Sequence, residues 1–422
     1  MKCIQPQHCT KVFHTARSKQ LIDDEDTTLI LLDFDVLEDR VRRLQEHFPP
    51  GTLHAVAVKT NPLAAVLRYL AQLGTGLEAA SLAEVMMAGR ALGRDDHIVF
   101  DSPAKTATDV AYLTDHQPGC YINVDNLDEL ALYPQKNSPF PLGLRVNPLI
   151  QTDSPDYLSV AGKASKFGVS FEYRKQIIEA FAKWDDLRGL HLHIGSSFQD
   201  LNPSVRAIGR VLELAEEINQ TLGEKKVEVL DIGGGFPVNY GKGEPYYVEE
   251  YAALLKEHHP QLWTDAYKVI TEFGRYVHAN AAWAVSKVEY VKPFPGGENA
   301  VIHAGADMFL RESYQPGDWH HDLYVMDAEG QLKSDVCDTK TNIAGPLCFG
   351  GDFLDRGRAL PPVSPGDWLM IADVGANTFS LWSRHCSRPF PKVLGFSSAT
   401  GGEDVRIIKE RESYEMLTRF WG

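Results

Sequence analysis

The stretch TLHAVAVKTNPLAAVLRYLAQLGTGLEAASLAEVMMAGRALG, residues 52–93, contains two hydrophobic patterns in alternation. Short apolar runs at 52–58 and 76–80 have the length and residue types of buried strands. The segments after them, 64–74 and 81–93, repeat apolar residues every three or four positions, as helices that face a sheet do. The stretch therefore predicts two consecutive strand–helix units.

The same alternation continues beyond this stretch, and a long amphipathic segment at 205–223 is a further predicted helix. Eight strands alternating with helices predict an α/β fold of the (β/α)8 TIM-barrel type, which we place at residues 35–280. The long link between the fifth and sixth strands fits this pattern least. The six further strand-like runs are 97–100, 120–124, 142–146, 190–194, 227–232 and 268–273.

After about residue 280 the pattern changes to strands separated by Gly, Pro and Asp turns, with little helix. Such a pattern is typical of a β-rich, sandwich-like or barrel-like domain. We expect this second domain to comprise residues 1–34 plus 281–422, with the strand-like run 28–34 joining it. Its other predicted strands are 285–291, 300–305, 323–330 and 367–375.

Composition narrows the classes of partner. The chain has 422 residues, 44% hydrophobic and 23% charged, with a formal net charge of −15 and no dense run of Lys or Arg. This argues against nucleic acid or an anionic membrane as the main partner. No stretch reaches the roughly 20 apolar residues of a membrane helix, and residues 1–20 lack the apolar core of a signal peptide. We therefore expect a cytoplasmic protein.

The six cysteines are scattered, without a CxxC pair. A disulfide framework or a zinc site is therefore not predicted, reduced thiols are expected, and we assign no metal ligands.

Lys59 ends the first predicted strand, just before Asn61-Pro62. Burial of an unpaired ammonium group is costly, and a buried lysine usually has a lowered pKa. Either the side chain of Lys59 reaches solvent, or the strand end needs a neutral, nucleophilic amine. For a lone lysine the first alternative is the commoner one.

Polar residues also follow the sixth, seventh and eighth predicted strands. Because active-site groups of such barrels lie at the carboxyl ends of the strands, we expect these residues to meet Lys59 on one face. Each has an ordinary alternative: a core histidine, a tight glycine turn, or an ion pair at the barrel rim. The residues are His193 and Ser196, then Gly233, Gly234 and Gly235, and finally Glu272 and Arg275.

Together these residues describe one kind of site. Glycine backbone N–H groups, with Ser196 and Arg275, suit a phosphate group. Lys59 could form an imine, Glu272 could keep a ring nitrogen protonated, and His193 offers a flat face for stacking. A cofactor with a phosphate, an imine-forming aldehyde and a pyridine ring is pyridoxal 5′-phosphate.

Seven motifs occur in an order that resembles the fold-type III pyridoxal-phosphate decarboxylases, the relatives of diaminopimelate, ornithine and arginine decarboxylase. The resemblance spans roughly residues 28–398. It implies a (β/α)8 barrel with a β-domain, and a head-to-tail homodimer whose subunits share each active site. The motifs are AVKTNP, SKFGV (165–169), HLHIGS (191–196), DIGGGFP (231–237), EFGR (272–275), GPLCFGGD (345–352) and DVGANTFS (373–380).

The resemblance also implies a role for individual residues. Lys59 is the amine that forms the Schiff base, His193 stacks on the cofactor ring, and Glu272 pairs with the pyridine nitrogen. Cys348, from the other subunit, protonates the carbanion left by the departing carbon dioxide. The phosphate group is held by Ser196, Gly233, Gly234, Gly235 and Arg275, with Asn377 near it.

The chain departs from the family pattern at two positions. Phe349 stands where diaminopimelate decarboxylases have an acidic residue that reads the distal ammonium group of the substrate, and Asn377 replaces a tyrosine. Arg311, in HAGADMFLRESY (303–314), lies where the diaminopimelate branch binds a substrate carboxylate. We assign Arg311, Phe349 and Asp352 to the substrate site. A second carboxylate without a free distal ammonium group would suit these residues.

The leading hypothesis is a pyridoxal-phosphate decarboxylase acting on a carboxylate-bearing amino acid or conjugate, as in a siderophore-type biosynthetic pathway. One alternative is diaminopimelate decarboxylase of lysine biosynthesis. Another is a catalytically inactive regulatory paralogue, which retention of Lys59 and Cys348 disfavours. A racemase is disfavoured because the alanine racemase branch places an arginine, not a residue such as Glu272, at the ring nitrogen.

Overall fold

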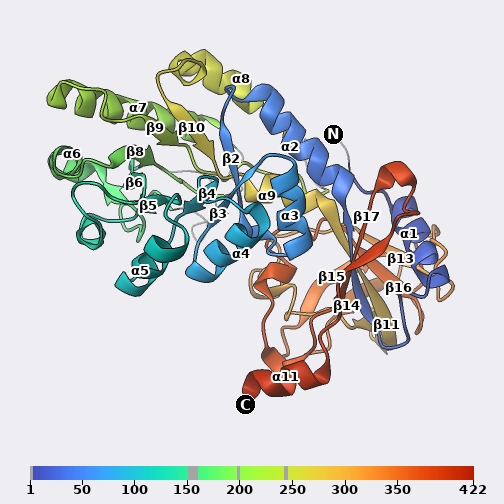
Figure 1. Ribbon diagram of the computed structural model, residues 1–422. Coiled ribbons are helices and arrows are strands. Elements are labelled where there is room, and N and C mark those ends of the chain that lie inside the picture. The colour runs from blue at the N-terminus through green and yellow to red at the C-terminus, as the bar shows by residue number, and fades with distance from the viewer. Residues whose placement is uncertain (1–2, 151–159, 197–199, 242–245) are drawn as a thin grey trace. The chain divides into compact units, whose positions relative to one another are not determined.

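The computed structural model describes residues 3–150, 160–196, 200–241 and 246–422. The chain divides into two compact units, which we call the barrel unit and the β-rich unit (Figure 1). The barrel unit comprises residues 40–238 and 245–276. The β-rich unit comprises residues 1–39, 239–244 and 277–422.

The barrel unit contains a closed ring of eight parallel strands, and this confirms the predicted (β/α)8 barrel. Each strand pairs with the next, and the last strand pairs with the first, Ile270 lying opposite Leu53. The ring has no free edge, so every strand has a hydrogen-bonded neighbour on both sides. The strands are β2 (Leu53–Ala57), β3 (Gly76–Ala79), β4 (Ile98–Phe100), β5 (Tyr121–Val124), β6 (Leu142–Asn147), β8 (Leu187–His191), β9 (Val229–Asp231) and β10 (Lys268–Thr271).

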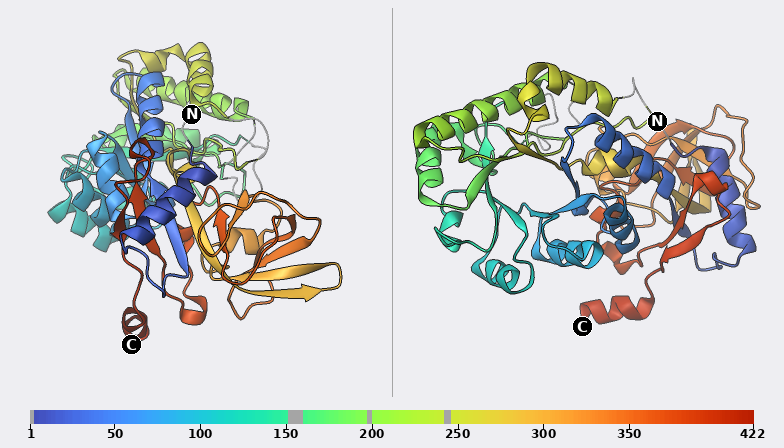
Figure 2. Two further views of the ribbon diagram at one scale, coloured as in Figure 1. Left: turned by 90° about the vertical axis from the view of Figure 1, so that its right-hand side faces the viewer. Right: turned by 45° about the horizontal axis from the view of Figure 1, so that its top comes forward.

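Helices surround this ring (Figure 2, right). Their ends carry the expected signals: Ser81 caps the start of α4 by accepting a hydrogen bond from the Glu84 N–H, and Gly93 ends it in the left-handed conformation. The long link after β6 contains the short strand β7 (Val169–Ser170) and α6. The helices are α2 (Phe34–His47), α3 (Ala64–Gln72), α4 (Leu82–Leu92), α5 (Ala107–His116), α6 (Arg174–Lys183), α7 (Asn202–Leu222), α8 (Val248–His258) and α9 (Gly274–His278).

Tyr121 fills the interior of the ring. It packs with Ala55, Val99 and Ile270 in a buried cluster. Its ring lies where Gly189 has no side chain, since a Cβ atom at that position would come 1.8 Å from the Tyr121 hydroxyl oxygen. A large side chain on one strand is thus accommodated by a glycine on another.

The β-rich unit is built on one branched sheet. β1 lies between β11, to which it is antiparallel, and β17, to which it is parallel, so the N-terminal strand 28–34 joins this sheet as predicted. β16 pairs with both β11 and β13. The strands are β1 (Thr28–Asp33), β11 (Ala282–Phe294), β12 (Gly297–Ile302), β13 (Leu323–Met326), β14 (Lys340–Ala344), β15 (Phe353–Ala359), β16 (Trp368–Ile371), β17 (Lys392–Phe396) and β18 (Arg406–Lys409).

Several elements of this unit were not anticipated. Strands β14, β15, β17 and β18 and the helices α1 (Pro6–Ser18), α10 (Leu310–Tyr314) and α11 (Tyr414–Trp421) have no counterpart in the sequence-based prediction. For α1 a signal was present, because its buried residues Cys9, Val12, Phe13 and Ala16 follow helical spacing. Among the described residues, no helix has both the length and the apolar character that a membrane span requires.

Candidate active site

The carboxyl ends of the barrel strands carry a group of ionisable residues, which are buried except for the exposed Lys59. Lys59 lies in the 3-10 turn Val58–Thr60 that follows β2. Asp101 follows β4, and Glu272 follows β10. Because all eight strands run in the same direction, these ends meet on one face of the barrel. The sequence-based prediction that Lys59, His193 and Glu272 converge is therefore met within the barrel unit.

Lys59 has a carboxylate partner. Its Nζ atom lies 2.8 Å and 2.6 Å from the two carboxylate oxygens of Glu78, in β3. Burial disfavours the ammonium form, but the charges of Glu78, Glu272 and Asp101 together outweigh it and raise the pKa of Lys59. The amine is therefore a paired ammonium ion here, and its side chain, 48% exposed, reaches solvent, which is the first of the two alternatives. A signal for Glu78 was present, as the charged residue inside the apolar run 76–80.

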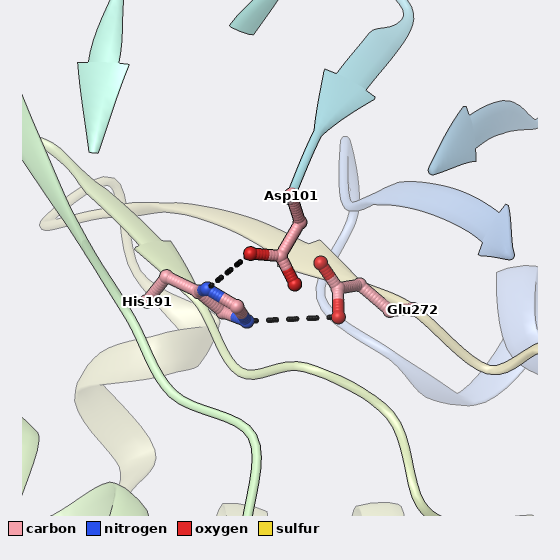
Figure 3. A group of neighbouring side chains, drawn as sticks. All are labelled: Asp101, His191 and Glu272. Atoms are coloured by element: carbon pink, nitrogen blue, oxygen red, sulfur yellow. Dashed lines mark ion pairs between the residues drawn. The ribbon is translucent and has the colours of Figure 1, made fainter. Parts of the chain in front are cut away.

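His191 lies between two carboxylates (Figure 3). Its Nδ1 atom is 3.7 Å from an oxygen of Asp101, and its Nε2 atom is 3.6 Å from Oε2 of Glu272. Burial alone would lower the pKa of this imidazole, but Asp101 and Glu272 raise it to about 9. The sequence analysis assigned no role to His191 or Asp101. His191 is two residues before His193, which is the spacing of side chains on one face of a strand.

His193 has a different protonation state. The N–H of Gly234 donates a hydrogen bond to its Nδ1 atom over 3.1 Å, so the proton of the neutral ring is on Nε2. Burial lowers the pKa of His193 to about 3. The side chain keeps 24% of its surface exposed, so it presents a neutral aromatic face at the site.

The glycine turn after β9 is required by close packing. A Cβ atom on Gly233 would lie 2.2 Å from the carbonyl oxygen of Leu192, and one on Gly234 would lie 2.4 Å from that of Glu272. Gly233 and Gly235 also have φ values of +67° and +93°, which favour glycine. The Gly233 N–H donates to the Asp231 carboxylate, and the Gly234 N–H donates to His193. These two donors therefore have protein acceptors, and phosphate binding by the glycine turn stays a prediction.

Ser196 and Arg275 lie next to one another. The Nε atom of Arg275, in α9, donates a hydrogen bond to the hydroxyl oxygen of Ser196 over 3.2 Å. The side chain of Arg275 is buried. A hydroxyl and a guanidinium group side by side suit an anion such as phosphate.

The remaining predicted site residues belong to the β-rich unit. Cys348 is exposed. The ring of Phe349 stacks on that of Tyr314, with centroids 5.4 Å apart and planes inclined by 16°. Asp352 is buried, and its carboxylate accepts hydrogen bonds from the N–H groups of Ala306 and Leu347 over 2.6 Å and 2.7 Å. The observed contacts of Asp352 thus organise the loop that carries Cys348.

Arg311 and Asn377 are close in this unit. One guanidinium nitrogen of Arg311 lies 3.3 Å from the carbonyl oxygen of Ala376 and 3.4 Å from the hydroxyl of Thr378. The guanidinium carbon lies 3.7 Å from the centroid of the Trp319 ring, a cation–π contact. Asn377 has a φ of +52°, a conformation that asparagine tolerates better than tyrosine. Their roles toward substrate and cofactor stay predictions.

Residues 34–279 match the family described as "Pyridoxal-dependent decarboxylase, pyridoxal binding domain". The chain belongs to this family. It is 31% identical over 393 residues to diaminopimelate decarboxylase of Deinococcus radiodurans, covering 92% of this chain and 93% of that one. It is 29% identical over 420 residues to the diaminopimelate decarboxylase of Methanothermobacter thermautotrophicus, covering 96% and 94%.

The fold agrees with this membership. The crystal structure of diaminopimelate decarboxylase from Helicobacter pylori complexed with L-lysine superposes with a TM-score of 0.83 and 27% sequence identity. The match covers 96% of this chain and 99% of that chain. The protein is a pyridoxal-phosphate-dependent amino-acid decarboxylase, as the sequence motifs indicated.

The barrel residues of this decarboxylase fit the cofactor. Oε1 of Glu272 is buried and has no hydrogen-bond partner among the described residues. A buried carboxylate oxygen without a donor is costly, and a protonated pyridine nitrogen would supply one. Lys59 supplies the amine, and the paired Ser196 and Arg275 supply donors for a phosphate group.

Proposed function

We propose that the chain removes one α-carboxylate from an amino acid that carries a second carboxylate, and that meso-diaminopimelate is its substrate. The observation that carries this proposal is the 31% identity to a diaminopimelate decarboxylase over 92% of the chain. The Helicobacter pylori relative was crystallised with L-lysine, which is what meso-diaminopimelate becomes when it loses one carboxylate. The diaminopimelate decarboxylase alternative therefore has more support than the siderophore-type hypothesis.

In this proposal each residue of the barrel site has a separate role toward the cofactor. Bound pyridoxal 5′-phosphate supplies the electron sink for the pair of electrons left by carbon dioxide. Lys59 would hold the cofactor covalently, and Glu272 would keep a proton on its ring nitrogen. His193, a neutral ring, would stack without adding charge. Arg275 and Ser196 would hold the phosphate group.

We further propose that Cys348 donates the proton that replaces the lost carboxylate, from the second subunit of a head-to-tail homodimer. The support is the GPLCFGGD motif and the exposure of the Cys348 side chain in the single chain. Arg311 would bind the distal carboxylate, a role that suits its bidentate fork. Symmetric dimers are the commonest oligomers, and shared sites would make the dimer the active form.

A second substrate class is favoured by Phe349. Its ring stacks on Tyr314, and an aromatic pair offers no carboxylate to a distal ammonium group. A conjugate whose distal amine is acylated, or that lacks this amine, would place an uncharged group there. Decarboxylation of such a conjugate is the siderophore-type reaction of the sequence-based hypothesis.

The test is a screen of carbon dioxide release over meso-diaminopimelate, its acylated conjugates, ornithine, arginine and lysine. Comparable or better kcat/KM for meso-diaminopimelate than for the conjugates supports the first proposal. Preference for the conjugates supports the second. Release from ornithine, arginine or lysine alone, none of which has a second carboxylate, contradicts both.

Phe349→Glu shows whether this position determines the preference between meso-diaminopimelate and its conjugates. Phe349→Leu is the control, because it removes the ring without adding charge. If it does, Phe349→Glu shifts preference toward meso-diaminopimelate, and Phe349→Leu does not.

A further inference from the structure

The cluster of Asp101, His191 and Glu272 contains two residues, Asp101 and His191, that had no role in the sequence-based prediction. The three side chains come from the ends of β4, β8 and β10. One ring nitrogen of His191 and one carboxylate oxygen each of Asp101 and Glu272 all lie within 4.8 Å of one another. His191 is fully buried, and its two ring nitrogens face different carboxylates (Figure 3). The imidazole is therefore clamped from both sides.

This arrangement fixes the charge of His191. Neither ring nitrogen has a hydrogen-bond partner among the described residues, and the nearest acceptors are the two carboxylates at ion-pair distances of 3.6 Å and 3.7 Å. A neutral imidazole has one N–H donor and would turn a lone pair toward one of the two carboxylates. The imidazolium ion has a donor for each, and a pKa raised to about 9 agrees with it. His191 is a buried cation at neutral pH.

The cation changes the state of Glu272. Burial favours the protonated acid, but His191, with a smaller contribution from the charge of Lys59, lowers the pKa of Glu272. The two histidines both approach Oε2 of Glu272, at 3.6 Å and 3.9 Å, and Oε1 keeps no partner among the described residues. The carboxylate is therefore ionised, and one specific oxygen is left available.

Asp101 lies on the Nδ1 side of the His191 ring. Its carboxylate lies 3.3 Å from a guanidinium nitrogen of Arg145, on β6, and the charges of Arg145 and His191 oppose burial to lower its pKa. Asp101 therefore stays ionised and fixes Nδ1 of His191. The charged and titratable groups that face this cluster are Lys59, Glu78, Lys105, Asp125, Arg145, His193 and Asp231.

We propose that His191 is a positioning residue: clamped by Asp101, it keeps Glu272 ionised and leaves Oε1 of Glu272 available to the ring nitrogen of the cofactor. The proposal rests on membership of the decarboxylase family and not on the choice of substrate. Without this cation, Glu272 would be buried near the carboxylates of Glu78 and Asp101, which favour its protonated form. A protonated Glu272 would no longer stabilise a proton on the ring nitrogen.

The test uses the holoenzyme of three variants. His191→Gln keeps polar groups of similar size but removes the charge, and Asp101→Asn removes the ionised partner while keeping His191. His54→Gln is the matched control, because His54 is also a buried barrel histidine but bonds Thr271 over 2.9 Å. The readout, without substrate, is the protonation of the ring nitrogen, followed by nitrogen-15 NMR of labelled cofactor against pH.

In the wild-type protein and in His54→Gln we expect a protonated ring nitrogen at neutral pH. In His191→Gln the ring nitrogen loses its proton at a pH lower by about one unit or more. In Asp101→Asn the pH at which the ring nitrogen loses its proton is also lower, but by less. With substrate, kcat of His191→Gln falls by roughly 10² while KM changes little, because His191 acts on the reacting ring and not on substrate contacts.

An unprotonated ring nitrogen in the wild-type protein, or an unchanged nitrogen signal in both His191→Gln and Asp101→Asn, overturns the proposal. A lower melting temperature with an unchanged signal assigns a purely structural role and also overturns it. If one variant does not fold, the other still decides. The NMR readout needs no substrate, so failure of the proposed substrate assignment would leave this test intact.

Discussion

At the scale of single residues, the site shows how buried charges balance one another. Lys59 and Glu78 form a pair at 2.6–2.8 Å, and His191 separates Asp101 from Glu272. Each cation lies beside carboxylates that would otherwise repel one another in a poorly solvated interior. Removing one member therefore leaves an uncompensated charge as well as a missing contact.

Lys59→Ala is expected to lower carbon dioxide release by roughly 10³-fold or more, because no other amine replaces the covalent attachment of the cofactor. Borohydride should fix the cofactor on Lys59 in the wild-type chain and on no residue of the variant, as mass spectrometry of peptides would show. Lys225→Ala, an exposed lysine, is the control and should keep full activity. Release at the wild-type rate by Lys59→Ala would contradict the assignment.

His54 predicts a pH dependence of stability. Burial lowers its pKa from 6.5 to about 4. Between these values the unfolded chain binds a proton that the folded chain does not, so the free energy of unfolding decreases as pH falls from 6.5 toward 4. The contribution of this one residue is up to about 3 kcal/mol.

Urea unfolding of the wild-type chain and of His54→Gln at pH 7 and at pH 4.5 (about two units below the usual histidine pKa) measures this contribution. The difference between the two proteins isolates His54 from His193 and His278, whose pKa values are also lowered by burial. Parallel pH profiles for the two proteins would show that His54 contributes nothing.

At the scale of the elements, the barrel depends on complementary side-chain sizes across its strands. Tyr121 on β5 lies over Gly189 on β8, and its hydroxyl has no hydrogen-bond partner among the described residues. Alternating apolar residues predict where the strands are, but they do not show which strand supplies the large side chain and which the small one. The pairing of a large side chain with a small one depends on contacts between different strands of the ring.

Gly189→Ala is expected to lower the free energy of unfolding by about 1–3 kcal/mol, because the new methyl group would meet the Tyr121 hydroxyl. Tyr121→Phe removes that oxygen and should restore much of the loss, while costing little by itself. Chemical unfolding of the four proteins gives the coupling energy.

Gly143→Ala is a matched control for this rescue. A Cβ atom there would meet both the Tyr121 hydroxyl and Oδ1 of Asn123, each at 2.5 Å. Tyr121→Phe should therefore rescue Gly143→Ala less than it rescues Gly189→Ala. Equal rescue of the two glycine variants, or none of either, would be inconsistent with the packing described.

At the scale of the whole molecule, the proposed dimer with shared sites makes a quantitative prediction. Lys59→Ala and Cys348→Ala should each be inactive or nearly so. After the two are mixed, dissociated and reassociated, a hybrid dimer has one site with both changes and one intact site, so about a quarter of wild-type activity should return.

The control is each variant taken through the same treatment alone, which should recover nothing. Dimers with sites confined to one chain would give no recovery on mixing, and activity that stays near zero would contradict shared sites. Sedimentation before and after mixing shows that exchange has occurred.

Much of the fold could be predicted from the sequence. All eight barrel strands were located, because parallel strands covered by helices are nearly continuous apolar runs. The β-rich unit was predicted less completely. β15, FLDRGRA, has charged and half-exposed residues, and β18 has only four residues. Neither therefore shows the clear alternation of apolar and polar residues that predicts a strand.

The site was predicted in part for a related reason. Lys59, His193 and Glu272 occur in short motifs next to strand ends, where position along the chain indicates position in the barrel. Glu78 and Asp101 lack such motifs, and their roles depend on neighbours on other strands. The contacts of Asp352 are likewise with backbone N–H groups of a loop and of a distant segment.

The sequence by itself determined the barrel and the family, and it predicted the residues that would hold the cofactor, because burial and local motifs are encoded along the chain. Only the tertiary structure decided how those residues are charged. The pKa of Lys59 is raised because Glu78 pairs with its ammonium group, and His191 is a cation because β4 and β10 each bring a carboxylate to one of its nitrogens. The physical reason is that charge in a buried site depends on distances of a few ångströms between strands far apart in sequence.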